Sequence, residues 1–114
     1  MALAELTRKK VENALGAFCQ KRVPGHVRHQ IRLTFEFRAD SVTLFEDRPV
    51  YNDPSRWTHS PIAQFRFADK SLKWTLYCCD RNSKWHKYLG LPATPSFDDL
   101  LAEVDRDPTG IFWG

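Results

Sequence analysis

Apolar residues recur every three or four positions at the start of the chain, which is the period of an amphipathic helix. The positions that share one stripe are Leu3, Leu6, Val11, Ala14, Leu15 and Phe18. Lys21 and Arg22 suit the last helical turn, where cations are favourable, and Val23-Pro24-Gly25 ends the pattern. The spacing therefore predicts a helix over residues 3–22.

The next segment alternates apolar and polar residues, which is the period of a strand. Its apolar positions are Ile31, Leu33, Phe35 and Phe37. A tight turn at Ala39-Asp40 would place Phe37 opposite Val42 and Phe35 opposite Leu44, so that both strands turn their apolar sides to one face. We predict an antiparallel hairpin here.

Residues 48–61 hold three prolines and show no clear period, so we expect a loop there. Alternation resumes in three further strands, at residues 62–67, 72–79 and 84–88. The inward positions expected in the first two are Ala63, Phe65, Phe67, Leu72, Trp74, Leu76 and Cys78.

A short C-terminal helix is predicted after Ser96, which suits an N-cap and stands three residues before Asp99 in the spacing of a capping box. Its apolar positions are Phe97, Leu100, Leu101 and Val104. The closing "IFWG" is expected to pack on the fold, although a docking motif is the alternative. The element order predicts one α+β domain over residues 1–114, an antiparallel sheet of about five strands with both helices on one face.

The stretch "YCCDRNSKWHKY" suggests either a metal site or a hairpin. A three-residue loop at residues 81–83 would pair Cys79 with Trp85 and Cys78 with His86. Adjacent strand residues point to opposite faces, so the two cysteines do not suit one ion, and a single Cys–His pair lacks the four ligands of structural zinc. We predict a hairpin and no metal site.

Composition narrows the class of protein. No apolar run approaches the roughly 18 residues that span a membrane, and the first residues lack the apolar core of a secretory signal. Three cysteines are an odd number, which favours free thiols in a reducing cytoplasm. Residues 1–38 carry eight Lys/Arg against three acids, whereas residues 96–114 carry one Arg against five acids. The two ends could therefore attract each other within one fold.

The outward sheet face is the surface with the most distinctive composition, with five cations, one acid and three aromatic residues. Its positions are Arg32, Thr34, Glu36, Arg38, Thr43, Phe45, Gln64, Arg66, Lys73, Thr75, Tyr77, Trp85 and Lys87. Aromatic rings can stack on bases while cations neutralise phosphates. The predicted nucleic-acid contacts are Arg32, Arg38, Arg66, Lys73, Tyr77, Trp85 and Lys87. The alternatives are a solvated sheet face and an interface with a partner protein or a second copy, so the oligomeric state stays open.

Histidines raise a third alternative, a metal-independent nuclease that uses His as acid and base. The candidate sets are His86 with Arg81 and Lys84, or His26 with His29. No glycine-rich phosphate loop, nucleophile elbow or dinucleotide fingerprint occurs, so we predict no cofactor and assign no catalytic residue. A second basic cluster follows the N-terminal helix and comprises Arg8, Lys9, Lys10, Lys21, Arg22, His26, Arg28 and His29.

Several long segments resemble a bacterial family of unknown function numbered 3024, found in actinobacteria. They are "FCQKRVPGHVRHQIRLTFEFRADSVTLFEDRP", "WTHSPIAQFRF", "WTLY", "DRNSKWHKY" and "LLAEVDRDPTGIFWG", covering nearly all of the chain from Phe18 onward. The resemblance implies a bacterial cytoplasmic protein and carries no activity. The chain departs from the family at Ser83, where glycine is commoner and a positive φ is expected, and at Cys78-Cys79.

Overall fold

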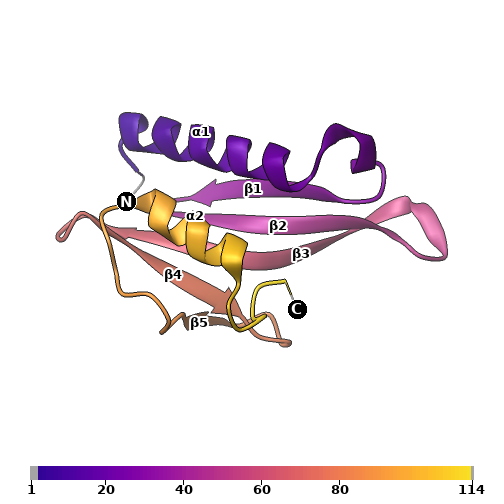
Figure 1. Ribbon diagram of the computed structural model, residues 1–114. Helices are drawn as coiled ribbons and strands as arrows, with labels where there is room; N and C mark the ends of the chain where they lie inside the picture. The colour runs from indigo at the N-terminus through magenta and orange to yellow at the C-terminus, as the bar shows by residue number, and fades with distance from the viewer. Residues whose placement is uncertain (1–2, 114) are drawn as a thin grey trace.

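The computed structural model describes residues 3–113 and has two layers (Figure 1). Helices α1 (Glu5–Arg22) and α2 (Phe97–Arg106) cover one face of a five-stranded antiparallel sheet in the order β1-β2-β3-β4-β5. The strands are β1 (Arg32–Arg38), β2 (Ser41–Val50), β3 (Asp53–Ala68), β4 (Lys73–Cys79) and β5 (Trp85–Lys87). A short 3₁₀ helix, η1 (Gly25–Val27), follows α1. The predicted α+β fold is confirmed.

The core lies between the helices and the inner face of the sheet. Alternate residues of the central strands are buried there: Val42, Leu44, Ala63, Phe65, Trp74, Leu76 and Cys78. The helices contribute Val11, Leu15, Leu100, Leu101 and Val104. Fully burying a side chain such as Leu stabilises the fold by about 1.5–3 kcal/mol. The predicted stripe on α1 is wrong at Leu6, which is 69% exposed. Leu6 precedes the buried Val11 and Leu15 by five and nine residues, so at 3.6 residues per turn it lies about 140° and 180° away from them around the helix.

Both predicted hairpin registers are confirmed. Phe37 pairs with Val42 and Phe35 with Leu44 across β1 and β2. Cys78 pairs with His86 across β4 and β5. In the second turn, Asp80 Oδ1 accepts hydrogen bonds from the backbone N–H groups of Asn82, at 2.8 Å, and Lys84, at 2.9 Å. Ser83 has the expected positive φ, 62°.

Two local predictions were wrong. Leu72 does not face the core: it lies in the turn before β4 with a φ of 57° and is 63% exposed. Ser96 is the N-cap of α2, but its side chain makes no capping hydrogen bond, so no capping box forms. Thr94 Oγ1 instead accepts from the Ser96 N–H at 3.2 Å, while Thr94 pairs through its backbone with Trp74.

The predicted loop at residues 48–61 was also wrong. β2 continues to Val50 and β3 starts at Asp53, so this segment forms a two-stranded ribbon that projects beyond the sheet (Figure 1). β1 pairs with β2 only as far as Asp47, and β4 pairs with β3 only as far as Ala63. Proline cannot donate a ladder hydrogen bond, but a ribbon with two open edges tolerates that loss. The ribbon therefore accommodates prolines that a central strand would reject.

The C-terminal segment packs on the fold, as predicted. After α2, Asp107 adopts a left-handed conformation, and its carboxylate accepts from the N–H groups of Phe112, at 3.0 Å, and Trp113, at 2.9 Å. The indole N–H of Trp113 donates to Val104 O at 2.8 Å. Phe112 is buried, so these bonds return the chain to the core instead of leaving a free docking motif.

Candidate nucleic-acid interface

The sheet face that points away from the helices carries all seven predicted contact residues. Strand pairing arranges this outer face in rows, because partners in register share a face. One row runs Glu36, Thr43, Gln64, Tyr77 and Lys87 across all five strands. The next row toward the sheet end contains Arg38, Ser41, Arg66 and Thr75. Lys73 follows on β4, and Trp85 lies at the end of β5 opposite Cys79.

A groove of about 420 Å³ crosses the middle of the outer face. Its apolar lining comes from Phe37, Phe45, Pro61 and Trp85. Its polar lining comes from Glu36, Arg38, Thr43 and Gln64. Trp85 is only partly exposed, so the aromatic surface predicted from the sequence is a recessed groove and not a flat platform.

A chain of side-chain contacts continues from this groove along β3. Gln64 Nε2 donates to Thr43 Oγ1 at 2.9 Å, and Gln64 Oε1 accepts from Arg66 Nε at 2.6 Å. The Arg66 guanidinium lies 3.8 Å above the centroid of the Tyr77 ring. One face of the Tyr77 ring is therefore covered by the Arg66 guanidinium. This guanidinium is planar and can itself stack on a base.

A second stacked pair lies at the opposite end of the outer face. The Arg32 guanidinium lies 3.7 Å from the ring centroid of Trp57, which belongs to the β2–β3 ribbon. Sequence analysis placed Trp57 in a loop and so missed it. Two arginine–aromatic pairs thus flank the groove along the direction of the strands, Arg66–Tyr77 on one side and Arg32–Trp57 on the other.

A histidine held between two carboxylates was missed as well. His59 Nδ1 lies 2.6 Å from Asp47 Oδ1, and Nε2 lies 3.3 Å from Glu36 Oε2. The ring stacks on Phe45, with centroids 3.8 Å apart and planes 15° apart. Burial lowers the pKa of His59, but the hydrogen bonds to Asp47 and Glu36 outweigh burial and raise this pKa above its ordinary value. The outer face therefore carries two acids, not one, and both are bound to His59.

Three of the predicted cations are unengaged within the described part of the chain. Arg38, Lys73 and Lys87 are exposed, and none of them forms an ion pair with another residue between 3 and 113. Exposed cations of this kind are available to neutralise an external anion.

The second basic cluster lies on the helical side and is partly used within the fold. Arg22 forms an ion pair with Asp105 at 2.8 Å and covers Trp113, with its guanidinium 3.9 Å from the ring centroid. Arg8 pairs with Glu12 at 3.1 Å. The basic N-terminal helix and the acidic C-terminal helix are therefore joined through Arg22 and Asp105, as the charge distribution suggested.

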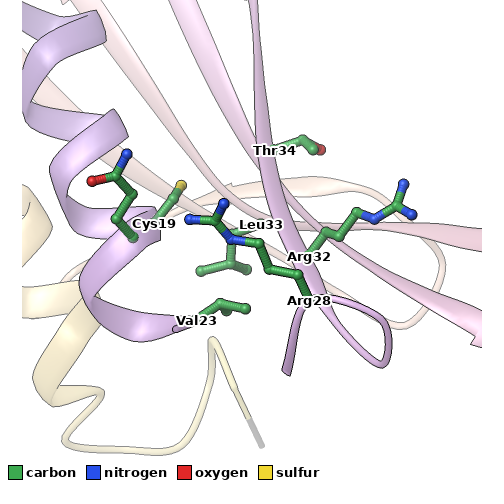
Figure 2. A pocket seen from close by; sticks show the side chains of 7 residues that line it. Cys19, Val23, Arg28, Arg32, Leu33 and Thr34 are labelled. Carbon is green, nitrogen blue, oxygen red and sulfur yellow. The ribbon is translucent and has the colours of Figure 1, made fainter. Parts of the chain in front are cut away.

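A small pocket of about 230 Å³ lies where the end of α1 meets β1. Figure 2 shows Cys19, Val23 and Leu33 around it, with Arg28 reaching toward Cys19 and Leu33 and Arg32 extending away. Burial raises the pKa of the Cys19 thiol to about 11, so this thiol is a poor nucleophile and a poor metal ligand at neutral pH.

The histidine sets considered for a nuclease lie outside the lining of the outer-face groove. His86 Nε2 lies 2.7 Å from Asp80 Oδ2, and this contact lowers the pKa of Asp80. His26 and His29 are exposed around η1. Residues 3–113 contain no group of three or more His, Cys, Asp or Glu side chains arranged to hold a metal ion. No helix in this range is long and apolar enough to cross a membrane.

These features define a small α+β domain with an open, basic and aromatic sheet face. The chain belongs to the family described as Domain of unknown function (DUF3024), which matches residues 3–114. Searches among curated proteins and among solved structures gave no match. The family match supports the resemblance seen in the sequence and assigns no activity.

Proposed function

We propose that this protein is a noncatalytic module that binds single-stranded nucleic acid through the outer face of its sheet. The observation that carries the proposal is the aromatic groove flanked by the Arg32–Trp57 and Arg66–Tyr77 pairs. Single-stranded bases can leave their stack and lie on aromatic rings or guanidinium planes, each contributing about 1–3 kcal/mol. A duplex keeps its bases stacked inside and suits such a face poorly.

Charge supports the same partner. The outer face has five Lys or Arg side chains against Glu36 and Asp47, and both carboxylates are hydrogen-bonded to His59. Their negative charge is partly compensated in place, which leaves Arg38, Lys73 and Lys87 to meet phosphates.

A homodimer through this face ranks second. In a two-fold dimer the same patch meets itself, so that Arg38, Lys73 and Lys87 would approach a second set of cations. A nuclease ranks third, because both ring nitrogens of His59 already contact carboxylates and the other histidines lie away from the groove. We keep the bacterial cytoplasm as the expected location.

The test is fluorescence anisotropy with labelled single- and double-stranded DNA and RNA oligonucleotides at 50 and 200 mM salt. Single-strand binding loses about 0.7 of a log unit in affinity for each neutralised phosphate per log unit of salt. With two to five phosphate contacts, we expect a roughly 10- to 100-fold loss of affinity between the two salt concentrations.

Matched charge reversals locate the surface. Lys87→Glu and Arg66→Glu on the outer face should weaken binding and flatten the salt dependence, whereas Lys9→Glu on α1 should change neither. Absence of binding at 50 mM salt would refute the proposal. So would a loss of binding in Lys9→Glu with none in the two outer-face variants, because the helical side would then be the binding surface.

A further inference from the structure

The groove on the outer face has walls and polar groups suited to one nucleobase. Phe45 and Trp85 line it, and its volume of about 420 Å³ lies within the usual range for a small-molecule site, about 300–1,000 Å³. A groove of this kind binds one unstacked base, since aromatic walls offer stacking and polar lining residues can contact the base edge. The identity of the base then depends on which polar groups remain available.

Gln64 and Thr43 are already committed to each other. The Gln64 amide donates to Thr43 Oγ1 and accepts from Arg66 Nε, so the protein already orients both of its ends. Arg38, by contrast, is exposed and makes no side-chain hydrogen bond within residues 3–113. Glu36 is 66% exposed at its side chain and uses only Oε2, toward His59, within the same range. Glu36 Oε1 and the Arg38 guanidinium are therefore the polar lining groups without a hydrogen bond to another residue in this range, and Glu36 Oε2 keeps a second lone pair for a ligand.

The Glu36 carboxylate is also held in position. His59 contacts it through Nε2, while Nδ1 is fixed by Asp47 and the imidazole ring rests on Phe45. Thr34 Oγ1 in turn donates to Asp47 Oδ2 at 3.2 Å. A side chain supported by a second layer of hydrogen bonds loses less conformational freedom when it binds a ligand. This arrangement gives the His59 cluster a role in positioning Glu36.

We propose, building on the proposed function, that the groove is selective for guanine, with Glu36 accepting from N1–H and the N2 amino group and Arg38 donating to O6 or N7. Guanine has two adjacent donors on its Watson–Crick edge, which match the two oxygens of a carboxylate. Adenine and cytosine offer one amino group beside an acceptor nitrogen, and thymine and uracil offer one N–H between two carbonyl oxygens, which a carboxylate repels. Arg38 lies two residues from Glu36 on the same strand face, about 7 Å along β1.

The first test compares labelled nonamers of thymidine with nonamers whose central base is guanine, inosine, adenine or cytosine, in anisotropy titrations at 50 mM salt. A good bidentate base contact discriminates by about 1–3 kcal/mol. The guanine nonamer should therefore bind roughly 5- to 150-fold more tightly than oligothymidine. Inosine lacks the N2 amino group, so its nonamer should lose most of that advantage.

Glu36→Gln separates selectivity from general binding. Glutamine keeps the size but offers one acceptor and one donor, so the advantage of guanine should fall below about threefold while oligothymidine still binds. The retained oligothymidine affinity shows that the variant is folded. Glu12→Gln on α1 removes the same charge away from the groove and should leave the preference for guanine unchanged.

The outcomes separate this inference from the proposed function. If all nonamers bind equally well, the guanine site is refuted and nucleic-acid binding stands. If no oligonucleotide binds but GMP binds better than CMP and loses that preference in Glu36→Gln, the groove is a site for free guanine nucleotides and the proposed function is refuted. If neither nonamers nor nucleotides bind, both are refuted.

Discussion

Tyr88 and Glu103 form a buried polar contact between the chain after β5 and α2. The Tyr88 hydroxyl donates to Glu103 Oε2 at 2.6 Å, and Glu103 also pairs with Arg106. Tyr88 and Glu103 are 7% and 4% exposed. A hydrogen bond to a charged group is worth about 1.5–3 kcal/mol. Because Arg106 remains as a partner, we expect Tyr88→Phe to lower the free energy of unfolding by about 2 kcal/mol.

The assay is urea and thermal unfolding at pH 7, followed by tryptophan fluorescence and circular dichroism. For a domain of this size, about 2 kcal/mol corresponds to a fall in Tm of roughly 5–12 °C. Tyr51→Phe is the control. It removes the same hydroxyl group, but from a side chain that is fully exposed at the ribbon tip and has no buried partner. Equal free energies of unfolding for Tyr88→Phe and Tyr51→Phe would show that the hydrogen bond between Tyr88 and Glu103 does not stabilise the fold.

The pH dependence gives a second signature of the same bond. The hydrogen bond from Tyr88 lowers the pKa of Glu103 below its ordinary value. The stabilisation that comes from the ionised Glu103 is therefore complete above about pH 4.3 and is lost as pH falls through the lowered pKa. The bond to Glu103, together with burial, raises the pKa of Tyr88 from 10.0 to about 12, so its contribution is full below pH 10 and is lost as pH rises toward 12. The difference in free energy of unfolding between wild type and Tyr88→Phe should be largest between these two pH limits. It should decrease at lower and at higher pH.

Three further predictions test other parts of the structure. Ser83→Gly should raise the free energy of unfolding by about 0.5–1 kcal/mol in urea, because Ser83 has a φ of 62°; an unchanged midpoint would mean that the turn is unstrained. With Cys78 and Cys79 replaced by Ser, Cys19 should react with iodoacetamide at pH 8 roughly 100-fold more slowly in the native state than in urea, since its pKa is about 11; a native rate near the unfolded one would contradict this. Arg22→Gln should speed hydrogen exchange at the C-terminal N–H groups, because it removes the ion pair with Asp105 and the stack on Trp113; wild-type protection would show that neither contact holds the segment.

Most of the fold was predictable, because each confirmed element has a strong periodic pattern and a short turn. The β1–β2 register followed from a two-residue turn and two apolar faces that had to coincide. The β4–β5 turn followed from the spacing between Asp80 and Lys84. The same alternation placed the seven predicted contact residues on the outer face. What it could not predict was the ribbon, because the prolines at 49, 54 and 61 are also typical of a loop.

Because the ribbon was predicted as a loop, the contact between His59 and Glu36 could not be predicted either. Even a correctly predicted strand would have misplaced His59, because Ala63 and Phe65 face inward and strict alternation from them puts residue 59 on the inner face as well. The structure instead has a register shift after Leu44, so that Leu44 pairs with Ala63 but Phe45 pairs with Pro61. The extra residue, Ile62, packs against the core.

This bulge exchanges the two faces of β3 for the remainder of the strand. His59 and Trp57 consequently reach the outer face, where His59 meets Glu36 and Trp57 meets Arg32. A bulge depends on tertiary contacts on both sides of a strand and leaves no periodic signal in the sequence. Deleting Ile62 would remove the extra residue and leave Pro61 next to Ala63, so that regular alternation alone would keep His59 on the outer face opposite Asp47. We therefore expect the shortened chain to fold, as shown by circular dichroism and oligothymidine binding, and to keep its preference for guanine in anisotropy titrations. A deletion variant that folds and binds oligothymidine but loses its guanine preference would show that the site needs the irregular backbone of the bulge and not only the face on which His59 lies.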